Sequence, residues 1–392
     1  MSHLYSARFV LILALQFTFG LGFSSFLLLP KYLAEVHGAD ATSIGRVAAA
    51  GPVAAVMVMP LLAFTIDRFR RHRLMLASAL MMLTAALGFA FTSSFGPGLY
   101  ALRMLQGAAF ASFMAAAATL VVEVVPKERL GQAIGLSGAS NLITNAIGPG
   151  VAEPLALAWG WRSVFLLSAL CSGLAAIGTS VLRDTRRAEL RQASLPRLAE
   201  PRRLGLFHSA LVSGLGFGTV VTFYQPLALE LGMSHVGSLF IGYTAAALGV
   251  RVAFGAWLDR FDRRSLVLLS TVVYTLVVLA TAGLRPGWLF PLGVALGLAQ
   301  GTLYPVSNAL LFELAEPQHR GALMTYFSGS FNLGIVIATL GLGALAGHIG
   351  YRPVFVVASA LTFTALPVLA RTLKKPGTHA TPGAIGLDSR PP

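Results

Sequence analysis

The chain alternates between long apolar runs and short polar segments. Each run is 20 to 27 residues long, which is about the length of α-helix that crosses the hydrocarbon core of a bilayer. Charged residues, glycine and proline gather between the runs and mark their ends. We therefore predict an all-α polytopic membrane protein with twelve membrane-spanning helices, at residues 8–30, 42–66, 74–94, 99–123, 131–156, 162–182, 206–230, 236–258, 265–284, 288–313, 321–347 and 352–371.

The chain also contains an internal repeat. Four short motifs occur twice, in the same order and 190 to 194 residues apart, which indicates a tandem duplication. Two pseudo-symmetric six-helix bundles related by an axis along the membrane normal are typical of secondary transporters. We predict an N-terminal half at 1–182, a cytoplasmic linker at 183–205, a C-terminal half at 206–372 and a disordered tail at 373–392. The motifs are 67–69 and 259–261, 106–107 and 300–301, 137–142 and 328–333, and 160–165 and 350–355.

Composition excludes most enzyme classes. The sequence is 56% hydrophobic and 11% charged, whereas soluble domains carry about 25% charged residues, so this chain cannot cover a water-facing surface. The one cysteine, Cys171, can form neither an internal disulfide nor a thiolate metal site. None of the four lysines completes a phosphate-binding loop, and no hydrolase motif is present. We expect a protein that is not an enzyme and that has no metal and no cofactor.

The formal net charge of +14 is explained by topology. If the N-terminus is cytoplasmic, the segments on the inner side hold most of the basic residues, as membrane proteins generally do. We therefore expect both termini in the cytoplasm, a lipid bilayer around the chain and no nucleic-acid partner. The basic residues expected on the opposite side are Lys31, Arg46, Arg162, Arg285 and Arg352.

At these repeats the sequence resembles the major facilitator superfamily, over residues from about 8 to 372. The loop motif of that family, G-x-x-x-D-R-x-G-x-R-R, is matched well in the second half and less fully in the first. The fourth-helix motif R-x-x-Q-G is matched at Arg103, Gln106 and Gly107. The fifth-helix motif of exporters is partial, because Gly148-Pro149 is intact while Thr144 and Ala152 replace glycines.

The resemblance implies a conformational latch at the cytoplasmic face. In the family, carboxylates at the ends of the second and eighth helices meet helix N-termini and nearby arginines and close that side when the protein opens outward. The alternative is an ordinary charged loop. The residues that match are Asp67, Arg68, Glu123, Arg129, Asp259, Arg260, Arg264, Glu313 and Arg320.

Charges within or at the edge of the spans are the candidates for substrate and proton coupling, because a charge inside a bilayer is costly and usually functional. Arg103 either faces a cavity or extends to the interface, and Arg251 either binds an anionic substrate or braces the cytoplasmic gate. Glu153 either couples protons, with Arg103 and Arg46 at a similar depth, or is an interfacial acid. Glu35 and Asp40 are expected to be solvated loop charges.

Polar side chains outline the expected cavity. Gln106, Asn141 and Asn145 belong to the fourth and fifth helices, and Gln300, Tyr304 and Asn308 form one stripe of the tenth. Such groups avoid lipid and therefore face protein or a wet cavity. The resemblance implies that the first, fourth, seventh and tenth helices line that cavity. Rows of small residues such as Gly293, Gly297 and Gly301 are expected to allow close helix packing.

Together these features predict a secondary transporter of the bacterial inner membrane, acting as a monomer on a small organic molecule. Proton-coupled export resembling that of bacterial drug exporters is the first expectation. Uptake or exchange of a small organic anion, using Arg251, Arg103 and Arg46, is the alternative within transport. A non-transporting receptor or scaffold is the alternative of another class.

Overall fold

The computed structural model describes residues 6–65, 70–92, 94–182, 200–253, 262–316 and 319–373, and every regular element within these ranges is a helix. Within these described ranges, ten helical segments are long and apolar enough to cross a membrane. This confirms an all-helical chain with many potential spans. The count differs from the predicted twelve because two predicted spans are not among the ten. The described part of one of them, α9 (Ser238–Ala253), is 16 residues long, and the other, α6 (Leu130–Trp159), carries Asn141, Asn145 and Glu153.

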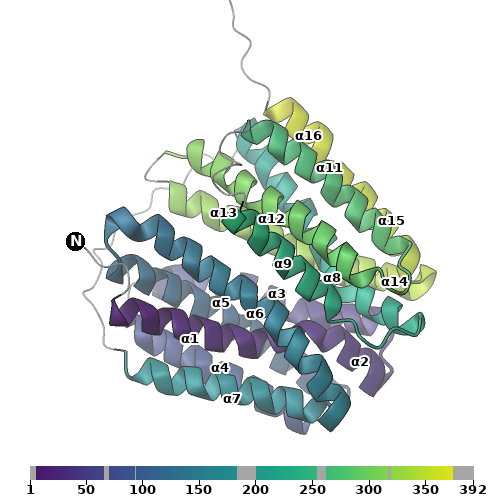
Figure 1. Cartoon of the computed structure of the whole chain (residues 1–392), viewed down its shortest axis with the longest axis horizontal. Coiled ribbons are helices and arrows are strands. Elements are labelled where there is room, and N and C mark those ends of the chain that lie inside the picture. The colour runs from purple at the N-terminus through teal and green to yellow at the C-terminus, as the bar shows by residue number, and fades with distance from the viewer. Residues whose placement is uncertain are drawn as a thin grey trace, which may run out of the picture.

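The first seven α-helices lie together on one side of the molecule (Figure 1). Their apolar side chains form two clusters, built around Phe113 and Phe89. The first predicted span is interrupted by a 3₁₀ segment, and Pro30 is the second residue of the short helix after it. The elements are α1 (Ala7–Ser24), η1 (Ser25–Leu28), α2 (Leu29–His37), α3 (Ala41–Thr65), α4 (Arg71–Phe91), α5 (Pro97–Val124), η2 (Lys127–Arg129), α6 (Leu130–Trp159) and α7 (Trp161–Ser180).

The remaining helices form a second group beside the first (Figure 1). Its apolar cluster surrounds Tyr224 and Tyr274 on α8 and α11. The predicted eleventh span contains a π-helical segment. Such segments are rare in proteins and often occur at functional sites. The elements are α8 (Pro201–Glu230), α9 (Ser238–Ala253), α11 (Arg263–Ala282), α12 (Leu289–Glu313), α13 (Arg320–Ile337), η3 (Ala338–Leu342), α14 (Gly343–Ile349), α15 (Tyr351–Phe363) and α16 (Ala365–Thr372).

Helices α9 and α12 pack along a row of glycines, as the sequence predicted. A Cβ atom at Gly293 would lie 2.1 Å from the carbonyl oxygen of Leu239, and one at Gly297 would lie 2.2 Å from that of Tyr243. No real side chain fits at these distances. The two backbones therefore approach closely because both positions lack a side chain.

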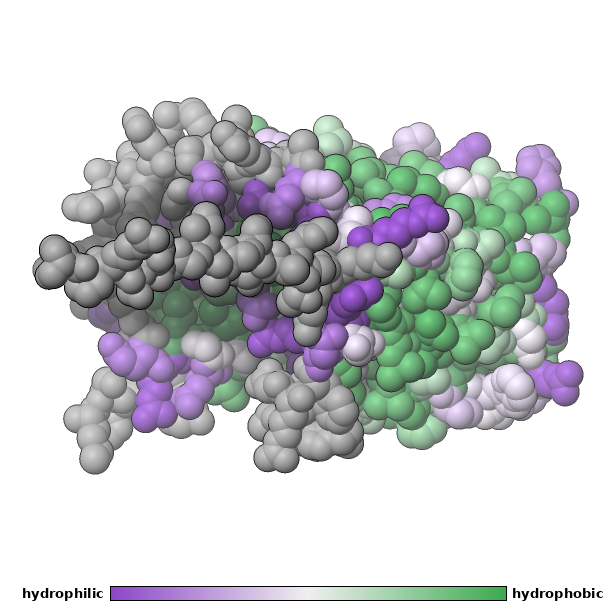
Figure 2. All heavy atoms as spheres, turned by 90° about the horizontal axis from the view of Figure 1, so that it is seen from above, coloured by the Kyte–Doolittle hydropathy of each residue, from purple (hydrophilic) through white to green (hydrophobic). Residues whose placement is uncertain are grey.

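Apolar side chains also cover the outside of the molecule. On α7, Leu166, Leu170, Leu174 and Ile177 are all exposed at helical spacing, so one face of this helix points outward. Figure 2 shows hydrophobic side chains across much of the molecule, with hydrophilic ones gathered toward the ends. An apolar band of this kind is the surface that a bilayer would cover.

The two ends of the molecule differ in charge. The arginine-rich end holds Arg71, Arg203, Arg263 and Arg320, at the starts of α4, α8, α11 and α13. The opposite end, called the far end below, holds α2, the C-terminal part of α6 and the segment before α9.

Candidate functional site

Glu153 joins the two groups of helices at the far end. It lies near the end of α6 and is only 6% exposed. Its Oε1 atom accepts the backbone N–H of Val236 at 2.7 Å, and its Oε2 atom accepts that of Gly237 at 2.9 Å. Both N–H groups stand just before the first residue of α9, where a helix leaves backbone donors unpaired and favours negative charge. The carboxylate of α6 therefore caps a helix of the second group.

Lys31 neutralises this buried carboxylate. The Lys31 ammonium is 1% exposed and lies 2.7 Å from Glu153 Oε1. It also donates to the carbonyl of Ser234, and Glu35 Oε1 lies 3.7 Å from it. The sequence placed Lys31 among the outer charges and expected arginines near Glu153. The partner of Glu153 is instead a lysine near the start of α2, directly after the η1 segment that packs against α6.

Gln225 adds a second connection at the far end. It lies on α8 and is completely buried. Its Oε1 atom accepts the backbone N–H of Lys31 at 3.2 Å, and its Nε2 atom donates to the carbonyl of Leu27 at 2.8 Å. Both of these hydrogen bonds join α8 of the second group to the η1–α2 segment of the first. Lys31, Glu153 and Gln225, with residues 234–237, are called the far-end junction below.

Helix α3 closes the far end against η3 and α14. Thr42 Oγ1 donates to the carbonyl of Gly343 at 3.5 Å, and a Cβ atom at Gly45 would lie 2.2 Å from the carbonyl oxygen of Thr339. Asp40 precedes α3, and hydrogen bonds from the side chain and backbone of Ser43 lower the pKa of its carboxyl. Asp40 is exposed as predicted, and it fixes the start of a helix that contacts the other group.

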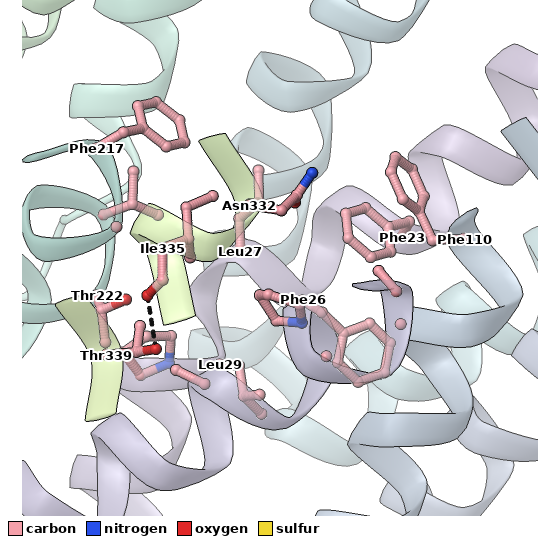
Figure 3. A pocket seen from close by; sticks show the side chains of 18 of the residues that line it. Phe23, Phe26, Leu27, Leu29, Phe110, Phe217, Thr222, Asn332, Ile335 and Thr339 are labelled. Carbon is pink, nitrogen blue, oxygen red and sulfur yellow. Dashed lines mark hydrogen bonds between the residues drawn. The ribbon is translucent and has the colours of Figure 1, made fainter. Parts of the chain in front are cut away.

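A cavity of about 290 Å³ lies between the two groups. Aromatic rings approach it from both sides: Phe23 and Phe110 stack with centroids 3.9 Å apart, and Phe217 lies across the cavity from them (Figure 3). Its polar groups include Asn141 and Asn145, two residues that the sequence singled out. We call this space the central cavity; it is lined by residues of α1, η1, α2, α3, α5, α6, α8, α9, α13 and η3.

Arg103 lines the central cavity. It lies near the start of α5, and its Nη1 atom donates to Gln106 Oε1. A Cβ atom at Gly51 would lie 3.1 Å from Arg103 Nε, so the absence of a side chain on α3 makes room for the guanidinium. Arg103 Nε is buried and donates to no hydrogen-bond partner within the described residues. The structure thus places Arg103 toward the cavity, whereas Gln106 is fully buried in the helix packing.

A wider pocket of about 790 Å³ lies at the arginine-rich end, between α6 and the helices α9, α11 and α12. We call it the vestibule. Arg251, Tyr304 and Asn308 line it, so two of the three residues in the predicted stripe of α12 face this pocket. The third, Gln300, is buried and lines neither pocket. Of the four helices expected around the central cavity, α1, α5 and α8 line it, whereas α12 lines the vestibule.

Two similar ion pairs stand at the arginine-rich end. Arg71 Nε lies 2.9 Å from Glu123 Oε1, between the start of α4 and the end of α5. Arg263 and Glu313 form the matching pair between the start of α11 and the end of α12. The internal repeat explains this symmetry, because the two pairs are 190 to 192 residues apart. The sequence predicted both glutamates as latch residues, together with Arg129 and Arg320 but without Arg71 and Arg263.

The other predicted residues have separate surroundings. Arg129 donates to Gln132 at 3.0 Å, and the Arg320 guanidinium lies 4.1 Å from the centre of the Phe312 ring. Arg264 donates to the carbonyl of Ala370 at 3.2 Å, and Arg46 is exposed on α3. Arg129 and Arg320, which the latch prediction placed with Glu123 and Glu313, therefore have other partners. Asp67, Arg68, Asp259 and Arg260 lie outside the described residues, as do most of the predicted linker and nearly all of the predicted tail.

Sequence reasoning did not select Lys31 or Arg71 as functional candidates. Lys31 is the one lysine that precedes the second predicted span, and a single lysine in an otherwise apolar segment was a usable signal. Arg71 stood within a run of four basic residues in six positions, where nothing distinguished it from its neighbours.

Comparison with known proteins gives a consistent result. The family model described as Major Facilitator Superfamily matches residues 10–234 and 206–389. The multi-drug resistance efflux pump PmrA of Streptococcus pneumoniae serotype 4 is 26% identical over 333 residues, which cover 78% of this chain and 80% of the relative. The multidrug resistance protein MdtG of Enterobacter lignolyticus is 24% identical, over 81% of this chain and 79% of the relative. Among solved structures, the nucleoside transporter NupG matches with a TM-score of 0.76 at 14% identity, over 95% of this chain and all of that one.

Proposed function

Since the chain belongs to the Major Facilitator Superfamily, we propose that this transporter exports a small organic molecule across a bacterial inner membrane, driven by inward proton flow. The observation that carries the proposal is the aromatic central cavity between the two groups of helices. Relatives named as multidrug efflux pumps support the outward direction. In this proposal the chain is a monomer of twelve spans in two six-helix halves, with the arginine-rich end and both termini in the cytoplasm.

The described conformation corresponds to a transporter closed at its outer side. The far-end junction connects the groups there through Glu153, Lys31 and Gln225, and the vestibule lies at the arginine-rich end. Alternating access requires these contacts to break when the cavity opens outward. The substrate then enters from the vestibule, occupies the central cavity and leaves after the junction separates.

Glu153 supplies the coupling step in this proposal. When the junction is closed, its two oxygens accept from the Lys31 ammonium and from the backbone N–H groups of Val236 and Gly237, a set of donors that suits an ionised carboxylate. When the junction opens, Glu153 meets outer water and can take up a proton. In this proposal, closure of the junction expels that proton. Export is coupled to inward proton flow if the proton leaves through the central cavity. The lining of this cavity includes Leu29 and Pro30, the neighbours of Lys31 in the sequence.

The test uses everted membrane vesicles that contain the protein in their membrane. A proton gradient, acidic inside, is formed across the membrane before the compounds are added. Ethidium, Nile red and 2-naphthoate represent cationic, neutral and anionic compounds. We expect at least one of them to accumulate inside the vesicles and to dissipate part of the gradient, and a protonophore to abolish accumulation. Vesicles without the protein are the control.

Three outcomes would contradict parts of the proposal. Accumulation that is indifferent to the gradient removes proton coupling. Accumulation only in right-side-out vesicles favours uptake or exchange of an organic anion, which the arginines in the two pockets also suit. Specific binding of the compounds by the purified protein, with no movement in either vesicle orientation, favours a receptor or scaffold.

A further inference from the structure

The central cavity carries one formal charge within its described lining, and that charge is positive. Arg103 is the one ionised group there, and the described lining contains no carboxylate. Within the described residues, no acidic side chain forms an ion pair with Arg103. Arg103 is half-buried, and a cation within a membrane-spanning helix is costly when it has no counter-charge. A ligand with one negative charge would remove that cost, whereas a cationic ligand would increase it.

The geometry of Arg103 also suits an anion. Its Nη1 atom already donates to Gln106, and Gly51 keeps the backbone of α3 close to the guanidinium without a side chain between them. Arg103 Nε is a buried donor without a partner within the described residues. A guanidinium binds a carboxylate or sulfonate through two parallel N–H donors. Arg103 lines the cavity, and its bond to Gln106 leaves donors of the guanidinium unused for such a group.

Neutral polar groups complete the surroundings. Asn141 and Asn145 of α6, Asn332 of α13 and Thr222 of α8 all line the same cavity. Amides and hydroxyls donate hydrogen bonds without adding charge. They can therefore hold the remaining oxygen of the acid group.

The rest of the cavity is aromatic. Phe23 and Phe110 lie on one side, and Phe217 lies opposite, 5.8 Å from the ring centre of Tyr243 (Figure 3). Aromatic rings stack on or meet the edges of other rings favourably. The volume of about 290 Å³ is at the lower end of typical ligand pockets. These features suit a compact ring system rather than a long chain or a large dye.

The vestibule has the same sign of charge as the central cavity. Arg251 and Arg263 both line the vestibule, whose described lining contains no carboxylate; Arg263 is paired with Glu313, so Arg251 carries the charge that is not compensated within the described residues. A pocket walled by one sign of charge raises the local concentration of the opposite ion. An anion is therefore attracted to the vestibule before it reaches Arg103.

We propose that the central cavity binds a compact aromatic monoanion, a carboxylate or sulfonate, whose acid group pairs with Arg103 and whose rings lie among Phe23, Phe110 and Phe217. This inference rests on the proposed function, because it names the substrate class of the same cavity. It also goes beyond that function, since a multidrug exporter need not prefer one charge. It holds for export and for uptake alike.

The test measures equilibrium binding to the purified, full-length protein in nanodiscs, so that it does not depend on transport. The probes are 2-naphthoate and 2-naphthamide, which share the ring system and differ in charge. We expect the wild-type protein to bind 2-naphthoate at least tenfold more tightly than 2-naphthamide. Acetate, an anion without a ring, is expected not to compete.

Variants at Arg103 assign the preference to this side chain. Arg103→Gln is expected to weaken 2-naphthoate binding at least tenfold and to leave 2-naphthamide binding within about twofold. Arg103→Lys keeps the charge but loses the planar donor pair, so an intermediate loss is expected. Arg285→Gln, at an exposed arginine of the far end that lines neither pocket, is the matched control and is expected to change neither affinity.

Equal binding of the two probes to the wild-type protein would overturn the proposal, and so would unchanged 2-naphthoate binding in a folded Arg103→Gln variant. Effective competition by acetate would show that the rings contribute nothing. These outcomes are separate from a failure of the export proposal, because vesicles can fail to show proton-driven accumulation while the binding difference persists.

Discussion

At the residue scale, the far-end junction depends on a buried ion pair that also caps a helix. Lys31 and Glu153 are both buried, and each contacts the segment 234–237 of the second group. Removing one partner of such a pair leaves an uncompensated charge, which costs about 3–5 kcal/mol, whereas removing both is often nearly neutral. The pair is therefore strongly coupled even if its net contribution to stability is small.

A double-mutant cycle tests this coupling. We expect Glu153→Gln and Lys31→Met each to lower the free energy of unfolding by about 3 kcal/mol, because each leaves its partner buried and unpaired. The double variant is expected to lose clearly less than the sum of the two. The measurement is thermal and denaturant unfolding of the purified protein in detergent.

Glu35 provides the matched control for this cycle. It is an exposed carboxylate 3.7 Å from the same ammonium, and exposed pairs contribute about 0–1 kcal/mol. Glu35→Gln should therefore change stability little. Additive losses from the two single variants would show that Lys31 and Glu153 do not act as a pair.

The sequence located the important carboxylate but not its partner. Glu153 attracted attention because an acid within an apolar run is rare, and that rule needs only the local pattern. Its pairing with Lys31 depends on the 3₁₀ break at η1 and on the position of α2. The same limit applies to Glu123 and Glu313, whose arginines come from the start of the preceding helix of each half.

At the scale of elements, helix packing was more predictable than side-chain pairing. Glycines at i, i+4 and i+8 indicate a contact wherever the helix lies, and the structure places α9 against this row of α12. The interruption of the predicted eleventh span by η3 was not predictable, since residues 338–342 are apolar and small like their neighbours.

Substitution of a contact glycine tests this packing. Gly297→Ala places a methyl group 2.2 Å from the carbonyl oxygen of Tyr243, so α9 and α12 must separate. We expect a loss of about 1–3 kcal/mol in unfolding free energy, as for other overpacked sites. Gly249→Ala on α9 is the control, because a methyl group there meets no atom within 4 Å. If the two variants unfold alike, the close approach at Gly297 does not contribute to stability.

At the scale of the whole molecule, the two groups contact each other at the far end through α3 as well as through Glu153. A Cβ atom at Gly347 on α14 would lie 3.7 Å from the Cβ atom of Thr42 on α3. Cβ atoms joined by a disulfide are usually 3.5–4.5 Å apart. Cysteines at these two positions can therefore lock the far end, provided that the one native cysteine, Cys171, is first replaced by alanine.

We expect the oxidised Thr42→Cys/Gly347→Cys protein to lose at least tenfold in transport rate and to regain it on reduction. The reason is that outward release requires α3 and α14 to separate, which a disulfide prevents. Cys171→Ala alone and each single cysteine variant are expected to transport alike with and without oxidant. Binding of 2-naphthoate to the oxidised protein should persist, because the vestibule stays open at the other end. Full transport by a completely cross-linked protein would exclude opening at the far end. Loss of both binding and transport would mean that the cross-link distorts the cavity instead of locking a closed state.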